Sequence, residues 1–325
     1  MHQSRLAVFT LAACAALASA TQNAVAADGH LYVQNGLYLA RFPLMRGIPA
    51  AKPDLTYTGY SAPVAVAPDG TVYATLANAS QEPTAVYAFA PGRNQPFRRI
   101  DIRQSQNCSI ETPPVQGLAV DGRGFLFALV NGSISGNRRH QLFTASSSFP
   151  CDGVVAYKPG ARGNAEPVST ILLNAYFYGG MTVTARDDLY IADQDNSTTY
   201  EYANALRNPT LQRSFVLPSS YDRTWGAAVD RSGNLYLLDG LYQKPEEIDV
   251  FPPRATGWPP ARTIEYTQDP TPYYGIAVGD RYAYVISDAA VELFKADSSG
   301  MQTPVDVLTI QNGNASGVSP IALGP

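Results

Sequence analysis

Residues 226–237 read Gly-Ala-Ala-Val-Asp-Arg-Ser-Gly-Asn-Leu-Tyr-Leu, which is an apolar strand, a tight turn and a second apolar strand. β-Branched and aromatic residues in the flanking segments are typical of strands. Ser232-Gly233 supplies the positive φ that a tight hairpin turn requires. This stretch therefore predicts a β-hairpin.

The same hairpin pattern recurs along the chain. A small residue or Pro begins an apolar strand, and a turn and a second strand follow; the other starting positions are Pro63, Gly117, Gly180 and Gly275. A third strand comes next, as at 86–89 or 291–294, and then a Pro/Gly-rich turn and a short fourth strand, as at 169–172. Four short antiparallel strands per repeat predict the blades of a β-propeller.

The two ends of the chain carry the two parts of a sixth repeat. Residues 320–325 read Pro-Ile-Ala-Leu-Gly-Pro, a first strand with no hairpin partner, and residues 28–33 read Asp-Gly-His-Leu-Tyr-Val, a turn and second strand with no first strand. Pairing them would cover two open strand edges and close a ring. We predict an all-β, six-bladed β-propeller over residues 27–325, as a single domain whose closing blade is shared between the N- and C-termini.

Residues 1–26 are typical of a signal peptide. Arg5 precedes an uncharged apolar run over residues 6–20, and residues 24–26 have the small-x-small pattern of a signal-peptidase site. The run is shorter than the roughly 20 residues that a membrane helix needs. We expect a secreted or periplasmic protein without a transmembrane span. An alternative is a lipoprotein anchored at Cys14, because residues 11–14 resemble a lipobox.

The composition indicates a large folded core and gives no sign of a nucleic-acid partner. Hydrophobic residues make up 45% of the 325 residues and charged residues 15%, and the formal net charge is −4. Lys and Arg are scattered rather than clustered in a basic stripe. We expect a monomer that binds no nucleic acid.

Removal of the signal peptide leaves two cysteines, Cys108 and Cys151, and an even count in an exported protein predicts a disulfide. A cysteine metal site is disfavoured because only His30 and His140 remain as imidazole ligands. Cys151 follows an insertion at residues 131–150. The insertion is either a lid over the channel mouth or a Ser-rich disordered flap.

Strand alternation places the starts of the first strands and the ends of the second strands on one face, which we name the top face. Amphipathic aromatic side chains and an amide precede several first strands. Aromatic side chains of this kind often bind the faces of sugars or the side chains of a protein partner. The alternative is that these rings pack and fill the channel. The candidate ligand-binding residues are Gln116, Tyr178, Trp225 and Tyr274, together with His140 in the insertion.

The second strands end in amide or carboxylate side chains. Such oxygens either hold a divalent metal, calcium or magnesium, or cap the turns that follow. The candidate metal ligands are Asn35, Asp193, Asp239 and Asp288, with Asn131 at the same position of its repeat. No nucleophile elbow, zinc-binding helix or phosphate loop is present in the sequence. We therefore assign no catalytic residue and, apart from this metal, no cofactor.

The repeat resembles the NHL-like and gluconolactonase-like six-bladed propellers, especially exported bacterial members with Ile-Ala-Val-Asp-x-x-Gly-x-Leu-Tyr-Val units. The resemblance covers essentially all of the mature chain and specifies the fold rather than the function. Lactonases of that superfamily hold a divalent metal on the channel axis, with an acidic residue at the start of a first strand. Here Pro or Gly occupies those starts.

Two functions follow as hypotheses. The first is an exported, non-catalytic propeller that binds a ligand or protein partner at its top face, with carbohydrate as one ligand class. The alternative is a metal-dependent hydrolase or lactonase that uses Asp193 and Asp239 as channel carboxylates.

Overall fold

The computed structural model describes residues 29–77, 85–102, 115–131, 152–173, 180–194, 196–218, 223–240, 246–266, 273–287, 289–310 and 320–325, without the side chains of residues 131, 152 and 246. These residues form strands and turns. Within them, no helix is long and apolar enough to cross a membrane.

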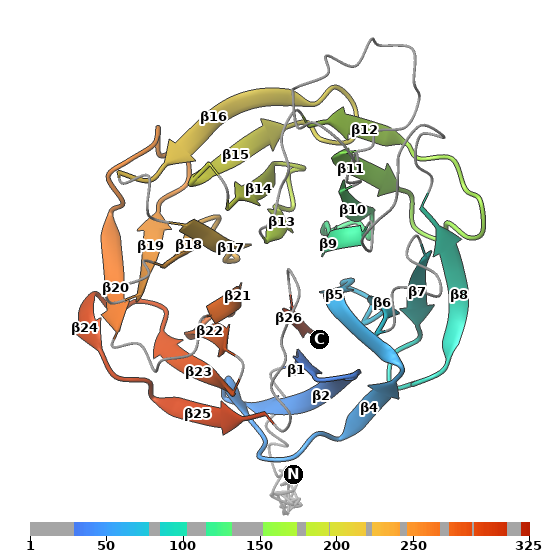
Figure 1. Cartoon of the computed structure of the whole chain (residues 1–325), viewed down its shortest axis with the longest axis horizontal. Helices are drawn as coiled ribbons and strands as arrows, with labels where there is room; N and C mark the ends of the chain where they lie inside the picture. Colours follow the sequence, from blue (N-terminus) through green and yellow to red (C-terminus); the bar gives the residue numbers. More distant parts are fainter. Residues whose placement is uncertain are drawn as a thin grey trace, which may run out of the picture.

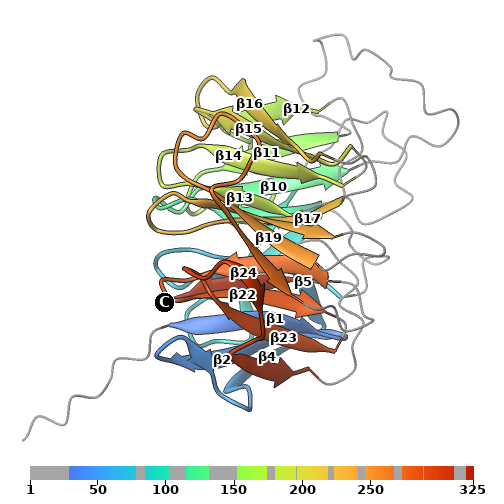
Figure 2. The ribbon, with the colours of Figure 1, turned by 90° about the vertical axis from the view of Figure 1, so that its left-hand side faces the viewer.

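Six small sheets of mainly antiparallel strands lie around a common axis as the blades of a propeller (Figure 1), and Figure 2 shows the same ring from its side. Blade 1 consists of β26 (Ile321–Gly324), β1 (His30–Asn35), β2 (Tyr38–Met45) and β4 (Leu55–Thr58), with β3 (Ile48–Pro49) beside β2. Blade 2 consists of β5 (Tyr60–Val66), β6 (Val72–Leu76), β7 (Ala85–Phe89) and β8 (Pro96–Asp101). Blade 3 consists of β9 (Val115–Val120), β10 (Leu126–Asn131), β11 (Asp152–Tyr157) and β12 (Ser169–Leu172).

The remaining blades follow the same order from the axis outward. Blade 4 consists of β13 (Met181–Val183), β14 (Leu189–Asp193), β15 (Thr198–Ala203) and β16 (Thr210–Val216). Blade 5 consists of β17 (Arg223–Val229), β18 (Leu235–Gly240), β19 (Glu246–Phe251) and β20 (Arg262–Tyr266), with β24 (Gly300–Gln302) parallel to β20. Blade 6 consists of β21 (Tyr273–Val278), β22 (Tyr282–Ser287), β23 (Ala290–Lys295) and β25 (Asp306–Thr309).

The two ends of the chain close the ring, as the sequence predicts. Strand β26 pairs antiparallel with β1, with Val33 opposite Ile321, and Figure 1 shows the two strands side by side. The backbone N–H of Gln34 also donates to the carbonyl oxygen of Pro320 at 2.9 Å. The fold class and the shared closing blade are therefore confirmed.

The hairpins between the first and second strands use a four-residue turn whose last position has positive φ. That position holds Gly70, Gly124, Asp187 and Gly233 in blades 2 to 5. In blade 3 the left-handed residue is Gly124 rather than Gly122 of the Asp-Gly pair. The Asp121 carboxylate accepts the N–H groups of Arg123 and Phe125, at 2.9 and 2.8 Å, so Asp121 takes the first position of the turn and Gly124 the last.

The core lies between neighbouring blades, where alternate residues of each strand face opposite ways. On one face of blade 5, residues including Tyr236, Leu238, Ile248 and Val250 pack against blade 6. On the other face, residues including Leu235, Leu237 and Phe251 pack against Tyr190 and Phe215 of blade 4. In β18 and β19, odd-numbered residues thus face blade 4 and even-numbered residues face blade 6.

A tyrosine–arginine contact joins the second and fourth strands in several blades. Arg98 Nη2 donates to the Tyr73 hydroxyl at 3.1 Å in blade 2, and Arg262 Nη2 donates to the Tyr236 hydroxyl at 3.1 Å in blade 5. Burial raises the pKa of Tyr73 and of Tyr236, while the adjacent guanidinium groups lower it in part. The contact therefore keeps the buried phenols hydrogen-bonded, and the pKa raised by burial keeps them neutral near pH 7.

Candidate functional site

The channel along the propeller axis is lined by the first strands of all six blades. Its volume is about 190 Å³, and its walls are residues 64–66, 118–120, 180–183, 226–229, 275–278 and 321–323. Among these described lining residues, Thr182 alone has a side chain with a hydroxyl or charged group. The described part of the channel wall is therefore a narrow, mostly apolar surface.

Glycine lies in or next to several first strands where neighbouring blades approach closely at the axis. A Cβ at Gly180 would lie 3.0 Å from Gly226 Cα, and one at Gly226 would lie 3.1 Å from Ile276 Cγ2. A Cβ at Gly275 would lie only 2.7 Å from Pro320 Cδ. The glycine at the start of these three repeats is thus explained by this close packing.

Four first strands carry a β-bulge at their top end. In blade 3, Leu129 pairs with Gly117 and the next residue, Val130, pairs with Val115, so Gln116 is the extra residue. By the same count, Trp225 is the extra residue in blade 5 and Tyr274 in blade 6. Blade 2 has its bulge at residues 62 and 63. Bulges redirect side chains and are frequent next to functional sites.

The bulges bring two predicted ligand-binding rings together. The indole of Trp225 and the phenol ring of Tyr274 meet edge-on, with centroids 6.2 Å apart and planes at 86°. Both side chains are partly exposed, and Trp225 packs at its base on a buried cluster that includes Tyr273 and Ile276. The pair is an aromatic surface across the junction of blades 5 and 6 that is held in place before any ligand binds.

Several predicted residues cannot be placed. The two cysteines of the predicted disulfide and three candidate ligands, together with the insertion at 132–150, lie outside the described residues: Cys108, Cys151, His140, Tyr178 and Asp288. The disulfide and the roles of these residues remain predictions.

The described members of the candidate metal set lie apart from the channel wall. Asn35, Asp193 and Asp239 are buried on the second strands β1, β14 and β18, each within its own blade. Asp193 caps the turn after its strand, because its carboxylate accepts the backbone N–H of Asn196 at 3.1 Å and the Asn196 amide at 2.6 Å. Asp193 therefore has the turn-capping geometry that the sequence left open as the alternative to metal binding.

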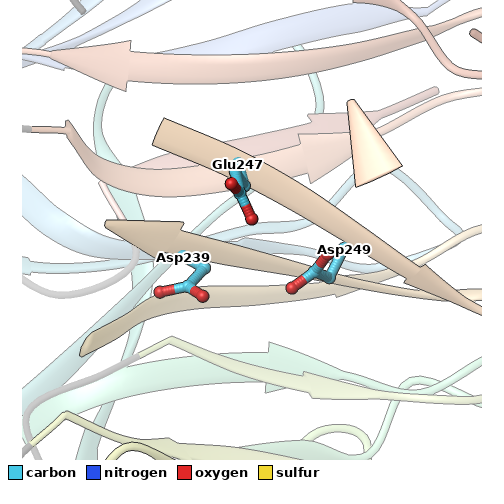
Figure 3. A group of neighbouring side chains, drawn as sticks. All are labelled: Asp239, Glu247 and Asp249. Carbon is cyan, nitrogen blue, oxygen red and sulfur yellow. The ribbon is translucent and has the colours of Figure 1, made fainter. Parts of the chain in front are cut away.

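Asp239 instead belongs to a group of three acidic residues within blade 5. One carboxylate oxygen from each of Asp239, Glu247 and Asp249 lies within 4.8 Å of the others, and Figure 3 shows these side chains pointing toward one another from two adjacent strands. Glu247 and Asp249 were not among the metal ligands predicted from the sequence. The sequence pattern that could have indicated them is the spacing of two residues between Glu247 and Asp249 in a strand. This spacing places both side chains on one face of the sheet, with Ile248 on the other.

No family model matches the chain, and no curated protein matches it. Among solved structures, the fold is similar to a chain in the crystal structure of the nidogen/laminin complex. The TM-score is 0.60 at 15% identity, and the match covers 90% of this chain and 97% of that chain. The gluconolactonase-like resemblance thus gains no support from a family model.

Two further solved structures are similar in fold. The WD40 repeats of RRP9 match with a TM-score of 0.52 at 8% identity, covering 91% of this chain and 80% of that one. A functionally unknown protein from Desulfotomaculum acetoxidans matches with a TM-score of 0.51 at 14% identity, covering 93% of this chain and 87% of that one. The chain is a six-bladed β-propeller. At these identities the similarity shows the fold alone.

Proposed function

We propose that this propeller is an exported, non-catalytic binding protein whose ligand or partner contacts the top face at Trp225 and Tyr274. The observation that carries the proposal is the bulge shared by three first strands. It sets Gln116, Trp225 and Tyr274 at one repeat position, where each leaves the regular ladder. A bulge retained at the same position in different blades supports a common role for the side chains that it redirects.

The chemistry of these side chains supports a ligand with both apolar and hydroxylated parts. Trp and Tyr rings offer a rigid apolar face and a polar group, and they dominate the binding energy of many interfaces. The amide of Gln116 offers a donor and an acceptor. A carbohydrate has C–H faces for the rings and hydroxyls for the amide, so we propose carbohydrate as the first ligand class to test.

A protein partner is the second class. The similar nidogen/laminin structure is that of a protein complex, which shows that a propeller of this fold occurs in one. Aromatic anchors of the Trp225 and Tyr274 type suit protein partners as well. We also propose export through residues 1–26 and a Cys108–Cys151 disulfide, which N-terminal sequencing and mass measurement before and after reduction would test.

The experiment is a glycan array probed with the wild-type mature protein and with the double variant Trp225→Ala/Tyr274→Ala. A matched control, Trp258→Ala/Tyr282→Ala, removes an exposed ring and a partly exposed ring from the bottom ends of blades 5 and 6. We expect binding by the wild type and the control and its loss in the double variant. Equal binding by all three proteins would contradict the proposed site, and a wild type that binds no glycan would exclude the carbohydrate class.

A further inference from the structure

The three acidic residues of blade 5 lie in the junction between blades 4 and 5. Asp239 is directly opposite Glu247 in the β18–β19 register, and Asp249 follows two residues later on the same face. Asp249 is 0% exposed, Asp239 is 7% exposed and Glu247 is partly exposed. Their odd numbers place all three on the face of blade 5 that packs against blade 4.

Such an arrangement suits a hard cation. Carboxylates this close repel one another, and the repulsion is stronger in a buried site than in water. Calcium binds oxygen ligands at about 2.3–2.6 Å, so ligands on opposite sides of one ion lie up to about 5 Å apart. The oxygens of Asp239, Glu247 and Asp249 lie within 4.8 Å of one another and fit around one such ion. An all-oxygen donor set favours calcium over softer transition metals.

A separate observation comes from the adjacent strand. Thr224 is 0% exposed and lies directly opposite Asp239 in the β17–β18 register, so its side chain shares that face. Within the described part of the chain, the Thr224 hydroxyl has no hydrogen-bond partner. A buried hydroxyl without a partner lowers the free energy of unfolding. We therefore expect a bound group beside Asp239 that interacts with the Thr224 hydroxyl.

Blade 4 contributes a second hydroxyl of the same kind. Thr199 on β15 is 0% exposed, and its hydroxyl likewise has no partner among the residues described. Thr199 lies opposite Ala192 in the β14–β15 register. Tyr190 is two residues from Ala192 along β14, so both face the same way, and Tyr190 packs against blade 5. Strand alternation therefore directs Thr199 toward blade 5 as well.

We propose that Asp239, Glu247 and Asp249 form a calcium site between blades 4 and 5, with the Thr224 hydroxyl as a neutral ligand. The site lies in a blade junction rather than on the channel axis, and its role is structural. Thr224 immediately precedes the bulged residue Trp225, so an ion held here would fix the strand that presents Trp225. This inference goes beyond the proposed binding function and does not depend on it.

The test is isothermal titration calorimetry of the mature protein with calcium chloride after removal of metals by EDTA. We expect binding at one site per chain. Asp239→Asn and Asp249→Asn should each weaken calcium binding by at least about 100-fold, because even the partners of metal ligands contribute about 10- to 100-fold. Thr224→Val should weaken it by about tenfold. Far-UV circular dichroism of each variant without metal establishes that it is folded.

The matched control is Asp193→Asn, which changes the acidic residue at the same repeat position of blade 4. Its calcium binding should equal that of the wild type. A wild type that takes up no calcium would overturn the proposal. So would folded Asp239→Asn and Asp249→Asn variants that bind as the wild type does, or loss of binding in Asp193→Asn.

A terbium titration gives a second readout. Tb³⁺ replaces Ca²⁺ in oxygen sites and emits when a nearby indole is excited, and the chain has two tryptophans, Trp225 and Trp258. We expect sensitised emission that calcium displaces and that Asp239→Asn abolishes. Emission that persists in folded Asp239→Asn would place the ion elsewhere and overturn the proposal.

Discussion

The ring of Trp225 meets the ring of Tyr274 edge-on across the junction of blades 5 and 6, with centroids 6.2 Å apart. Each ring comes from the bulge of a different first strand. The contact joins two repeats that are about 50 residues apart in the chain. The contact between the two side chains therefore contributes to the stability of the propeller as well as to the proposed binding surface.

The first prediction is that these two rings are energetically coupled. Edge-to-face aromatic pairs contribute about 0.5–1.5 kcal/mol beyond the area that they bury. Trp225→Ala, Tyr274→Ala and the double variant, unfolded in urea, should give a coupling free energy in that range. Trp225 and Tyr282 do not share this ring contact, so the losses in the free energy of unfolding from Trp225→Ala and Tyr282→Ala should be additive. Additive losses for Trp225 and Tyr274 would show that the contact contributes no stability.

The second prediction concerns glycine at the axis. Gly275→Ala should lower the free energy of unfolding by about 1–3 kcal/mol, because the added methyl group would overlap the ring of Pro320. Gly122→Ala is the control, since its Cβ would meet Ala185 Cβ at an ordinary 3.4 Å. Chemical denaturation of both variants measures the difference. Equal stability of the two variants would contradict close packing between blades 6 and 1.

The third prediction is an alkaline unfolding transition. Burial raises the pKa of Tyr32, Tyr57, Tyr73, Tyr190 and Tyr236 above the ordinary value of 10.0. These phenols release protons more easily in the unfolded chain than in the folded one. Their contribution to stability is therefore complete below pH 10 and is lost as the pH rises beyond it.

Tyrosinate absorbance and circular dichroism measured together follow this transition. We expect part of the tyrosine absorbance to appear only when the ellipticity is lost, and we expect Tyr57→Phe to move the midpoint to higher pH. Ionisation of all 20 tyrosines near pH 10 with unchanged ellipticity would be inconsistent with buried, neutral phenols.

The sequence predicted the ring because each repeat carries its own local signals. Starting positions such as Gly226 and turns such as Ser232-Gly233 depend on neighbours within a few residues. The closing blade was also predictable, since the incomplete patterns at 28–33 and 320–325 complement each other. The outer strands β3 and β24 were not expected. Strand β24 pairs with β20 of the preceding blade, and no local pattern specifies such a contact.

The candidate site was predicted in part. The sequence selected Gln116, Trp225 and Tyr274, but it did not show that they are bulge residues, because a bulge depends on the register with the second strand. It indicated Asp239 but not Glu247 or Asp249, because the repeat relates equal positions of different blades and not neighbouring strands of one blade. The structure instead groups Asp239 with residues of the next strand in its own blade.

Closure of the propeller depends above all on the pairing of the chain ends, and this closure places the bulges around one mouth. Gln34 and Pro320 are joined by a backbone hydrogen bond, so the next pair, Val33 and Ile321, is a non-hydrogen-bonded pair with close Cβ atoms. Cysteines at such a pair are placed to form a disulfide.

The most direct measurement is therefore mass spectrometry of peptides from the oxidised Val33→Cys/Ile321→Cys variant. The account predicts a cross-link between these two positions in the folded monomer, and none in Val33→Cys/Ala322→Cys, where the side chains point to opposite faces. Failure of the first pair to cross-link in folded protein, or equal cross-linking of both pairs, would contradict the closed ring.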